Sequence, residues 1–183
     1  PLESLKFRKG QKMLSQNMEQ ALNKQLNAEL YSAYLYLSMA AYFYSLNLNG
    51  FANWMTVQNQ EETMHAMKFY TFINDRGGRI TLTQIDAPPT TWTSPLNAFE
   101  ETLKHEQKVT SLINNLVDLA ITERDHATNT FLQWFVTEQV EEEASDTEVI
   151  QNLKLAGNDP HSLFMLDREL GTRVFTPPAT SST

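Results

Sequence analysis

A glutamate and a histidine stand one helical turn apart in the segment QNQEETMHAM, residues 58–67. The residues on both sides of this segment are aromatic and aliphatic, with the spacing of a buried helix. Burying ionisable side chains costs several kcal/mol unless they are paired or bind a cation. Glu62 and His65 are therefore candidate metal ligands, although an E-x-x-H pair alone is a weak signal.

The same pattern occurs in three other segments. Each of four segments has a stripe at steps of three and four residues that is apolar at both ends and acidic near its middle. The stripes are Leu22, Leu26, Glu29, Ala33, Tyr36 and Ala40; Phe51, Met55, Gln58, Glu62, His65, Phe69 and Phe72; Phe99, Leu103, Glu106, Thr110, Ile113 and Val117; and Leu132, Phe135, Gln139, Glu142, Asp146, Val149 and Leu153. Carboxylates gathered at one level of a core repel one another, and two divalent cations would neutralise them. Glu and His ligands without thiolates fit iron, and also zinc or manganese.

Each candidate also has an ordinary structural interpretation. Glu29 alone would be a boundary carboxylate, and the run 141–143 would be a solvated face. The tyrosines of residues 31–44 would pack in the core and at interfaces. His105 and His126 are expected at the surface. The conjunction of four stripes, each with a carboxylate at a compatible height, favours the metal site.

Helical periodicity extends over most of the chain. It predicts helices over residues 13–44, 51–76, 95–124, 128–156 and 160–170. Gly77-Gly78 marks the end of the second helix, and Ser94-Pro95 supplies an N-cap and first position for the third. Residues 79–95 have no helical period and are long enough to run the length of a bundle. An all-α four-helix bundle with one long crossover and a short fifth C-terminal helix is therefore expected.

Composition limits the partners. With 183 residues the chain fits one domain, expected over 1–175 with a disordered tail over 176–183. The net charge of −8 favours cations over nucleic acid. The absence of cysteine excludes disulfides and thiolate metal sites, and no apolar run has membrane-spanning length. We expect no nucleic-acid or membrane partner, and a cytoplasmic location, or an organelle if a targeting segment preceded Pro1.

Five segments carry a family resemblance: NAELYSAYLYLSM (27–39), QEETMHAM (60–67), KHEQ (104–107), FLQWFVTEQVEEE (131–143) and LAGNDPHSLFMLDREL (155–170). They resemble the non-haem ferritins of the bacterial and archaeal type. The resemblance implies a ferritin-like four-helix bundle and an iron-storage ferritin with ferroxidase activity. Such a protein oxidises Fe²⁺ with dioxygen or peroxide at a diiron centre and stores Fe³⁺ mineral in a homo-oligomeric shell of 24 subunits.

The resemblance also assigns site residues. Glu29, Glu62 and His65 would hold one iron, and Glu62, as a bridge, would hold the second with Glu106 and Glu142. Tyr36 matches the tyrosine beside the diiron centre, so the expected catalytic residues are Glu62, His65 and Tyr36.

A third iron site is implied as well. Glu61, Glu138 and Glu141 match the residues that form it together with Glu142. Gln139 matches a glutamine close to the second iron of the diiron centre.

Two departures from a related group are informative. Bacterioferritin-like chains carry E-x-x-H on the second and fourth helices, whereas the fourth segment here has Gln139-x-x-Glu142. Their haem-ligating methionine would fall at Thr63, so we predict no haem. One alternative is a non-catalytic shell subunit that only stores or nucleates mineral, which would require losses among the ligands, and none is visible. The other alternative function is a diiron oxygenase or peroxidase that acts on a separate substrate. It would need an access cavity and usually a second histidine ligand.

Apolar residues beyond the stripes predict an oligomer. Tyr31, Tyr34, Tyr42 and Phe43 cannot all point inward, and the segment 160–170 has more apolar residues than solvent exposure permits. A closed symmetric assembly would cover both surfaces. By resemblance to ferritins, the short fifth helices would meet at a fourfold axis.

Overall fold

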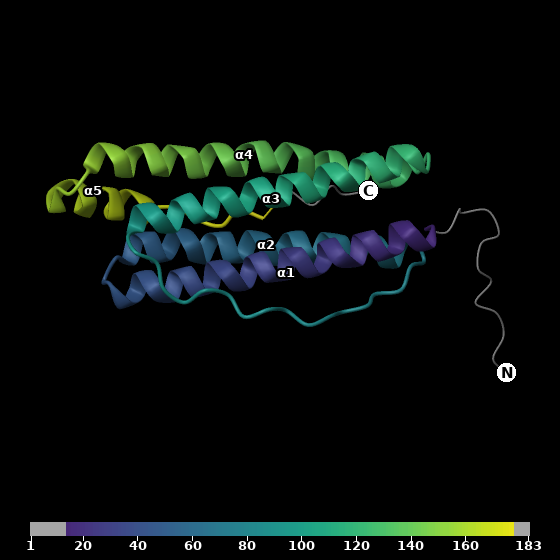
Figure 1. Ribbon diagram of the computed structural model, residues 1–183, viewed down its shortest axis with the longest axis horizontal. Helices are drawn as coiled ribbons and strands as arrows, with labels where there is room; N and C mark the ends of the chain where they lie inside the picture. The colour runs from purple at the N-terminus through teal and green to yellow at the C-terminus, as the bar shows by residue number, and fades with distance from the viewer. Residues whose placement is uncertain (1–13, 178–183) are drawn as a thin grey trace.

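Five helices form the protein in a computed structural model that describes residues 14–177. They are α1 (Gln16–Ser45), α2 (Asn49–Asp75), α3 (Pro95–Thr122), α4 (His126–Ala156) and α5 (Pro160–Leu170). Figure 1 shows α1 to α4 aligned along one axis, with α5 at one end of the bundle. The predicted all-α, ferritin-like bundle is therefore confirmed, and the predicted helix bounds differ from the observed ones by at most three residues.

The segment between α2 and α3 runs along α1 for most of its length (Figure 1). Near one end of α1, Asn23 accepts a hydrogen bond from the backbone N–H of Thr81 at 2.7 Å. Near the other end, the hydroxyl of Tyr42 donates to the carbonyl of Trp92 at 2.9 Å. The crossover thus returns the chain to the end where α2 began, so α2 and α3 run in the same direction.

Side chains cap the helix N-termini. Ser15, Ser94, Asp125 and Asp159 each accept a hydrogen bond from a backbone N–H in the first turn of α1, α3, α4 and α5. The cap at Asp125 places the start of α4 two residues before the predicted position.

The N-terminus of α2 has no cap residue of its own. Instead, Asp167 of α5 accepts hydrogen bonds from the backbone N–H groups of Gly50 and Phe51 at 2.8 and 3.1 Å. A Cβ atom at position 50 would lie 1.5 Å from the Asp167 carbonyl oxygen, so this contact requires glycine. It fixes α5 to the end of the bundle.

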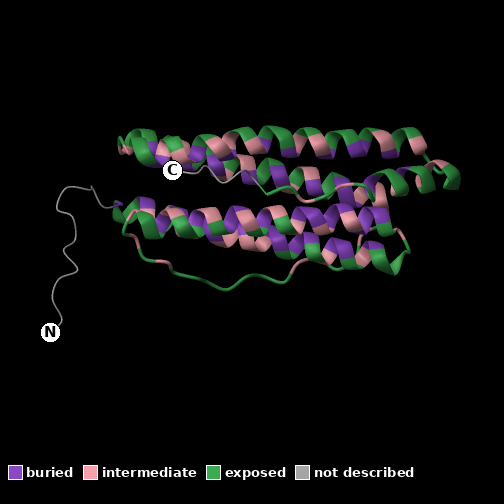
Figure 2. Ribbon diagram, turned by 180° about the vertical axis from the view of Figure 1, so that it is seen from behind, coloured by how far each residue is buried: buried purple, intermediate pink, exposed green. Residues whose placement is uncertain are grey.

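The core consists of two apolar clusters with a polar layer between them. One cluster contains Phe43, Phe51 and Phe99, and the other contains Leu26, Phe69 and Phe135. On every long helix the buried polar residues of the predicted stripes lie between the two clusters; they are Glu29, Gln58, Glu62, His65, Glu106, Gln139, Glu142 and Asp146. Figure 2 shows that the buried faces of the helices turn toward one another.

Some predicted core positions were wrong. On α3 the buried residues include Thr102, Val109 and Leu116, whereas the predicted Leu103, Thr110 and Val117 are half-buried. The buried stripe of α3 is therefore rotated by about one residue from the predicted stripe, because α3 packs against both α1 and α4. Phe72 on α2 is also half-buried.

The aromatic residues of α1 divide between core and surface. Phe43 is fully buried, Tyr31 and Tyr42 are half-buried, and Tyr34 is exposed. Within residues 14–177, no helix combines the length and the apolar character needed to cross a membrane. Most of the predicted disordered tail falls on residues 178–183, which lie outside the described residues.

Candidate metal centre

Three predicted ligands meet in the polar layer between α1 and α2. Glu29, Glu62 and His65 are each at most 2% exposed, and one ligand atom from each lies within 4.8 Å of the others. Glu29 Oε2, Glu62 Oε2 and His65 Nε2 have no hydrogen-bond partner. Unpartnered buried oxygen and nitrogen atoms are costly in a metal-free protein. This donor set fits a hard or borderline divalent cation.

Neighbouring side chains orient this group. Gln25, one turn before Glu29 on α1, donates a hydrogen bond from Nε2 to Glu29 Oε1 at 2.7 Å. His65 Nδ1 lies 3.5 Å from Glu62 Oε2. The second oxygen of Glu29 and the Nε2 atom of His65 therefore remain available for a ligand.

Helices α3 and α4 bring two more predicted ligands to the same layer. Glu106 and Glu142 are buried, but neither belongs to the group whose ligand atoms lie within 4.8 Å. Glu106 accepts hydrogen bonds from the Tyr36 hydroxyl and from Gln139 Nε2, the latter at 3.1 Å. Glu142 accepts from Gln58 Nε2 at 2.8 Å. These donors orient Glu106 and Glu142, the ligands predicted for the second iron.

The carboxyl groups of the polar layer lie close enough to raise one another's pKa. Burial, followed by the neighbouring Glu62, raises the pKa of Glu29 well above its usual range. Burial, then Glu106 and Glu142, raises the pKa of Glu62 in the same way. Burial and the Glu142 charge raise the pKa of Glu106 to about 8. These carboxyl groups therefore favour their protonated forms, and a bound cation would favour the charged forms.

Tyr36 is a hydrogen-bond donor at this centre. Burial and the Glu106 charge raise the pKa of its hydroxyl well above the usual value, so it stays protonated. Its bond to Glu106 crosses the bundle from α1 to α3.

The residues of the predicted third site lie near one another but less tightly grouped than Glu29, Glu62 and His65. Glu61 and Glu138 are half-buried and Glu141 is exposed. Within residues 14–177 they do not form a second group of ligand atoms as close as the first. Glu61 Oε2 instead accepts a hydrogen bond from Arg173 Nη2 at 2.6 Å. Burial raises the pKa of Glu61 to about 7, against the opposing Arg173 charge.

Comparisons with known proteins identify the family of this chain. The family model described as "Ferritin-like domain" matches residues 19–156. The chain belongs to the ferritin family. Ferritins bind iron, and the family implies a role in iron storage.

Several ferritins of bacteria and archaea are similar over most of their length. The bacterial non-heme ferritin of Bacteroides fragilis is 44% identical over 161 residues, which cover 88% of this chain and 100% of that one. The bacterial non-heme ferritin of Staphylococcus aureus is 42% identical over 89% of this chain and 98% of that one.

Solved ferritin structures share the fold. The open-pore ferritin of the hyperthermophilic archaeon Archaeoglobus fulgidus is 55% identical, with a TM-score of 0.87 over 88% of this chain and 98% of that one. An engineered closed form of the same ferritin is 55% identical, with a TM-score of 0.88 over 89% and 99% of the two chains.

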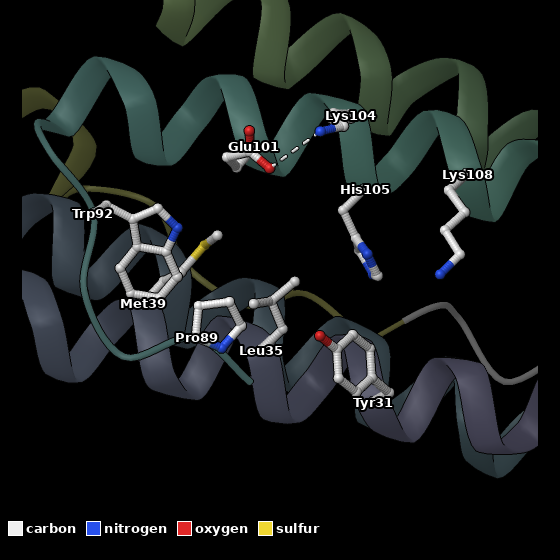
Figure 3. Close-up of a pocket in the computed structure, with 9 residues that line it drawn as sticks. All are labelled: Tyr31, Leu35, Met39, Pro89, Trp92, Glu101, Lys104, His105 and Lys108. Carbon is white, nitrogen blue, oxygen red and sulfur yellow. Dashed lines mark ion pairs between the residues drawn. The ribbon is translucent and has the colours of Figure 1, made fainter. Parts of the chain in front are cut away.

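His105 was predicted at the surface, and the structure shows that this prediction was wrong. His105 is half-buried, its Nε2 atom lies 2.8 Å from Ser32 Oγ, and its ring packs against Tyr31 and Tyr36. It ends a cavity of about 270 Å³ between α1, α3 and the crossover, where Figure 3 shows it pointing toward α1 beside Tyr31. Burial, followed by the Lys108 charge, lowers the pKa of His105 to about 4, so this ferritin keeps the ring neutral at physiological pH. His126 is exposed, as predicted.

Two more residues near the centre were given no role from the sequence. Asp146 is fully buried, one turn after Glu142 on α4, and neither of its carboxylate oxygens has a hydrogen-bond partner. Arg173 follows α5 and reaches Glu61 from a segment without helical periodicity. The acidic stripe pattern identified the position of Asp146, whereas no sequence signal identified Arg173.

Proposed function

We propose that this chain is an iron-storage ferritin with ferroxidase activity at a diiron centre within each subunit. The observation that carries this proposal is the buried group of Glu29, Glu62 and His65, each with an unpartnered ligand atom. Glu106 and Glu142 lie in the same layer, and their carboxylate oxygens can bind a second cation while Tyr36 and Gln139 keep their hydrogen bonds to Glu106. Two Fe²⁺ ions at sites that share a carboxylate can each give one electron to the same oxidant.

The side chains have distinct roles in this reaction. Glu62 bridges the two iron ions, His65 and Glu29 hold the first, and Glu106 and Glu142 hold the second. Carboxylates stabilise Fe³⁺ more than Fe²⁺ because their interaction grows with the charge of the ion. Two Fe²⁺ ions supply two electrons, which reduce dioxygen with two protons to hydrogen peroxide, or hydrogen peroxide with two protons to water.

Proton movement accompanies iron binding. The carboxyl groups with raised pKa values must release their protons when Fe²⁺ binds. Tyr36 keeps its hydrogen bond to Glu106 and so limits the movement of this ligand. Gln139, which also donates to Glu106, fixes the same carboxylate from α4.

Storage requires a closed assembly. Large apolar side chains are exposed on α1 and α5, including Tyr34, Leu37, Phe164 and Met165 at 49 to 54%. Exposed apolar patches of this kind mark interfaces between subunits. We propose a homo-oligomeric shell of 24 subunits, consistent with similarity to the ferritins of A. fulgidus.

An aerobic Fe²⁺ titration combined with size-exclusion chromatography tests both the ferroxidase activity and the storage shell. The wild-type chain should oxidise Fe²⁺ rapidly and elute as a large shell that retains iron. Iron should co-elute with protein well beyond the few ions that the centre itself can hold. Iron that remains limited to the centre, together with O₂-dependent conversion of an added organic substrate, would instead support a diiron oxygenase or peroxidase.

A further inference from the structure

The segment after α5 turns back along the bundle and lies against α2. Figure 1 shows it running from α5 toward the middle of the long helices. Asn53 on α2 donates hydrogen bonds from Nδ2 to the carbonyl of Arg173 at 2.9 Å and to that of Leu170 at 3.4 Å. These bonds fix the backbone of the segment at the position from which the Arg173 side chain enters the bundle.

The Arg173 guanidinium binds three residues on one face of α2. Its centre lies 4.4 Å from the ring centroid of Trp54. Its Nη2 atom donates to Gln58 Oε1 at 2.5 Å and to Glu61 Oε2 at 2.6 Å. Residues 54, 58 and 61 recur at helical spacing, so the guanidinium lies along α2 at the edge of the acidic layer.

Gln58 connects this contact to the metal centre. Its Oε1 atom accepts from Arg173, and its Nε2 atom donates to Glu142 at 2.8 Å. Because arginine can only donate and a carboxylate can only accept, the two partners fix the orientation of the Gln58 amide. Arg173 therefore holds Glu61 directly and Glu142 through Gln58.

Unpartnered groups remain around this contact. Arg173 Nη1 is buried and has no hydrogen-bond acceptor, while both oxygens of Asp146 are buried and have no donor. The positive charge of Arg173 acts on Asp146 as well as on Glu61. The guanidinium thus lies near more acidic groups than its single positive charge can balance.

We propose that Arg173 is a tethered cation at the acidic edge of the metal centre, where it competes with a metal ion for Glu61 and holds Glu142 through Gln58. This inference rests on the proposed function. A divalent ion that binds Glu61 Oε2 must displace the guanidinium, because two cations cannot share one carboxylate oxygen at hydrogen-bond distance without strong repulsion. An ion that binds Oε1 is opposed by the same adjacent positive charge. Arg173 would then weaken the binding of a further metal ion beside the diiron centre. The weakly bound ion would leave more readily for the stored mineral.

Anaerobic calorimetric titration of the assembled, full-length protein with Fe²⁺, and separately with Zn²⁺, tests the proposal. Arg173→Gln should leave binding to Glu29, Glu62 and His65 unchanged and strengthen binding of an additional ion by about tenfold. A structural defect would weaken metal binding, so an increase in affinity is specific to competition. Arg168→Gln removes the same charge from α5, where the residue is exposed, and should titrate like the wild type.

A measurement on the wild-type chain covers the case in which Arg173→Gln fails to assemble. Hydrogen exchange of the backbone over residues 171–177 should become faster when Zn²⁺ fills the additional site, because the segment is then held by the Asn53 bonds without the added contacts of the Arg173 side chain. Unchanged exchange under saturating Zn²⁺ would overturn the proposal, as would an Arg173→Gln titration identical to the wild type. If the wild type oxidised iron normally in either case, the ferroxidase proposal would stand and only the role of Arg173 would fail.

Discussion

The hydroxyl of Tyr36 on α1 donates a hydrogen bond to Glu106 on α3, across the centre of the bundle. Both residues are fully buried, and Gln139 of α4 donates to the same carboxylate. The two bonds to Glu106 thus connect α1, α3 and α4 at the layer that contains the candidate metal ligands. Tyr36 is therefore in a position to affect the metal centre without binding a metal itself.

Tyr36→Phe should retain the fold and metal binding but slow the oxidation of Fe²⁺ by about tenfold, the usual effect of losing a partner of a metal ligand. The free energy of unfolding should fall by about 1 kcal/mol, because one buried hydrogen bond is lost. Stopped-flow absorbance measures the oxidation and thermal unfolding measures the stability. Tyr42→Phe is a suitable control, since it loses a hydroxyl that binds the crossover rather than the centre. Equal oxidation rates in Tyr36→Phe and Tyr42→Phe would contradict the assignment.

Glu62→Ala should abolish rapid oxidation, lowering the initial rate by more than about 100-fold, because it removes a ligand that both iron ions share. His65→Ala should weaken mainly the first iron, so that a higher Fe²⁺ concentration recovers part of the rate. Initial rates across a range of Fe²⁺ concentrations separate the two cases. A wild-type rate for Glu62→Ala, with two Fe²⁺ oxidised per subunit, would show that the ligands are assigned wrongly.

The helical stripes made the first half of the centre predictable. Steps of three and four residues determine which side chains share a face, and Glu29, Glu62 and His65 meet because two neighbouring helices place them at one height. The same rule placed Glu106 and Glu142 in the layer. It could not predict that Tyr36, Gln139 and Gln58 hold these two carboxylates in hydrogen bonds.

Residues whose position depends on irregular backbone were not predictable. Arg173 reaches Glu61 only because the chain reverses after α5 and Asn53 fixes its path. His105 is half-buried because its ring packs against Tyr31 and Tyr36 of α1. Neither contact follows from helical periodicity, since the first depends on the path of a non-helical segment and the second on how α1 and α3 pack together.

Glu138→Ala should leave the first fast phase of oxidation largely intact and change the number of Fe²⁺ ions oxidised per subunit or the later turnover. Glu138 is half-buried, and burial raises the pKa of its carboxyl group. Glu141 is exposed on the same helix, so Glu141→Ala should have the smaller effect. Oxidation traces at increasing ratios of Fe²⁺ to protein measure the stoichiometry. Identical stoichiometry and turnover in Glu138→Ala and the wild type would exclude a metal role for Glu138.

The metal-free protein should lose stability as the pH rises from 6.5 to 8. Glu106 has a pKa of about 8 in the folded state against an ordinary value of 4.5, so the folded state holds a proton that the unfolded chain has released. The resulting stabilisation is fully present below about pH 4.5 and is lost as the pH rises through about 8. Glu61, with a pKa of about 7, acts in the same direction.

Comparison with Glu106→Gln isolates this contribution. The neutral amide cannot titrate, so its stability should fall less over the same range, by a difference on the order of 1 kcal/mol. His105 acts in the opposite direction, because its pKa is about 4 in the folded state against an ordinary value of 6.5. Its contribution to the free energy of unfolding therefore increases between about pH 4 and 6.5. The range from pH 6.5 to 8 avoids this effect. Urea denaturation in the presence of a chelator gives both curves. A wild-type curve that rises relative to the variant would contradict the raised pKa of Glu106.

The short helix α5 provides the sharpest test of assembly. Part of its apolar set belongs to its own subunit, because Leu166 and Leu170 are buried in the core cluster at this end of the bundle. Deletion of residues 159–183 would therefore remove core side chains, and loss of the shell in that variant would have two explanations. Phe164 and Met165 are each 54% exposed, so they can be changed with little effect on the core.

The double variant Phe164→Ser, Met165→Ser should give a folded subunit that forms smaller oligomers or a shell that leaks mineral, because an interface loses its apolar contacts. Leu155→Ser is the matched control, since Leu155 lies near the end of α4 and is 85% exposed. Light scattering coupled to size-exclusion chromatography measures the assembly, and circular dichroism verifies the fold. If the wild type were a stable monomer at micromolar concentration, the proposed storage shell would be wrong even with an active diiron centre. If the wild type formed a shell and the double variant matched it in size and iron retention, α5 would not be the interface.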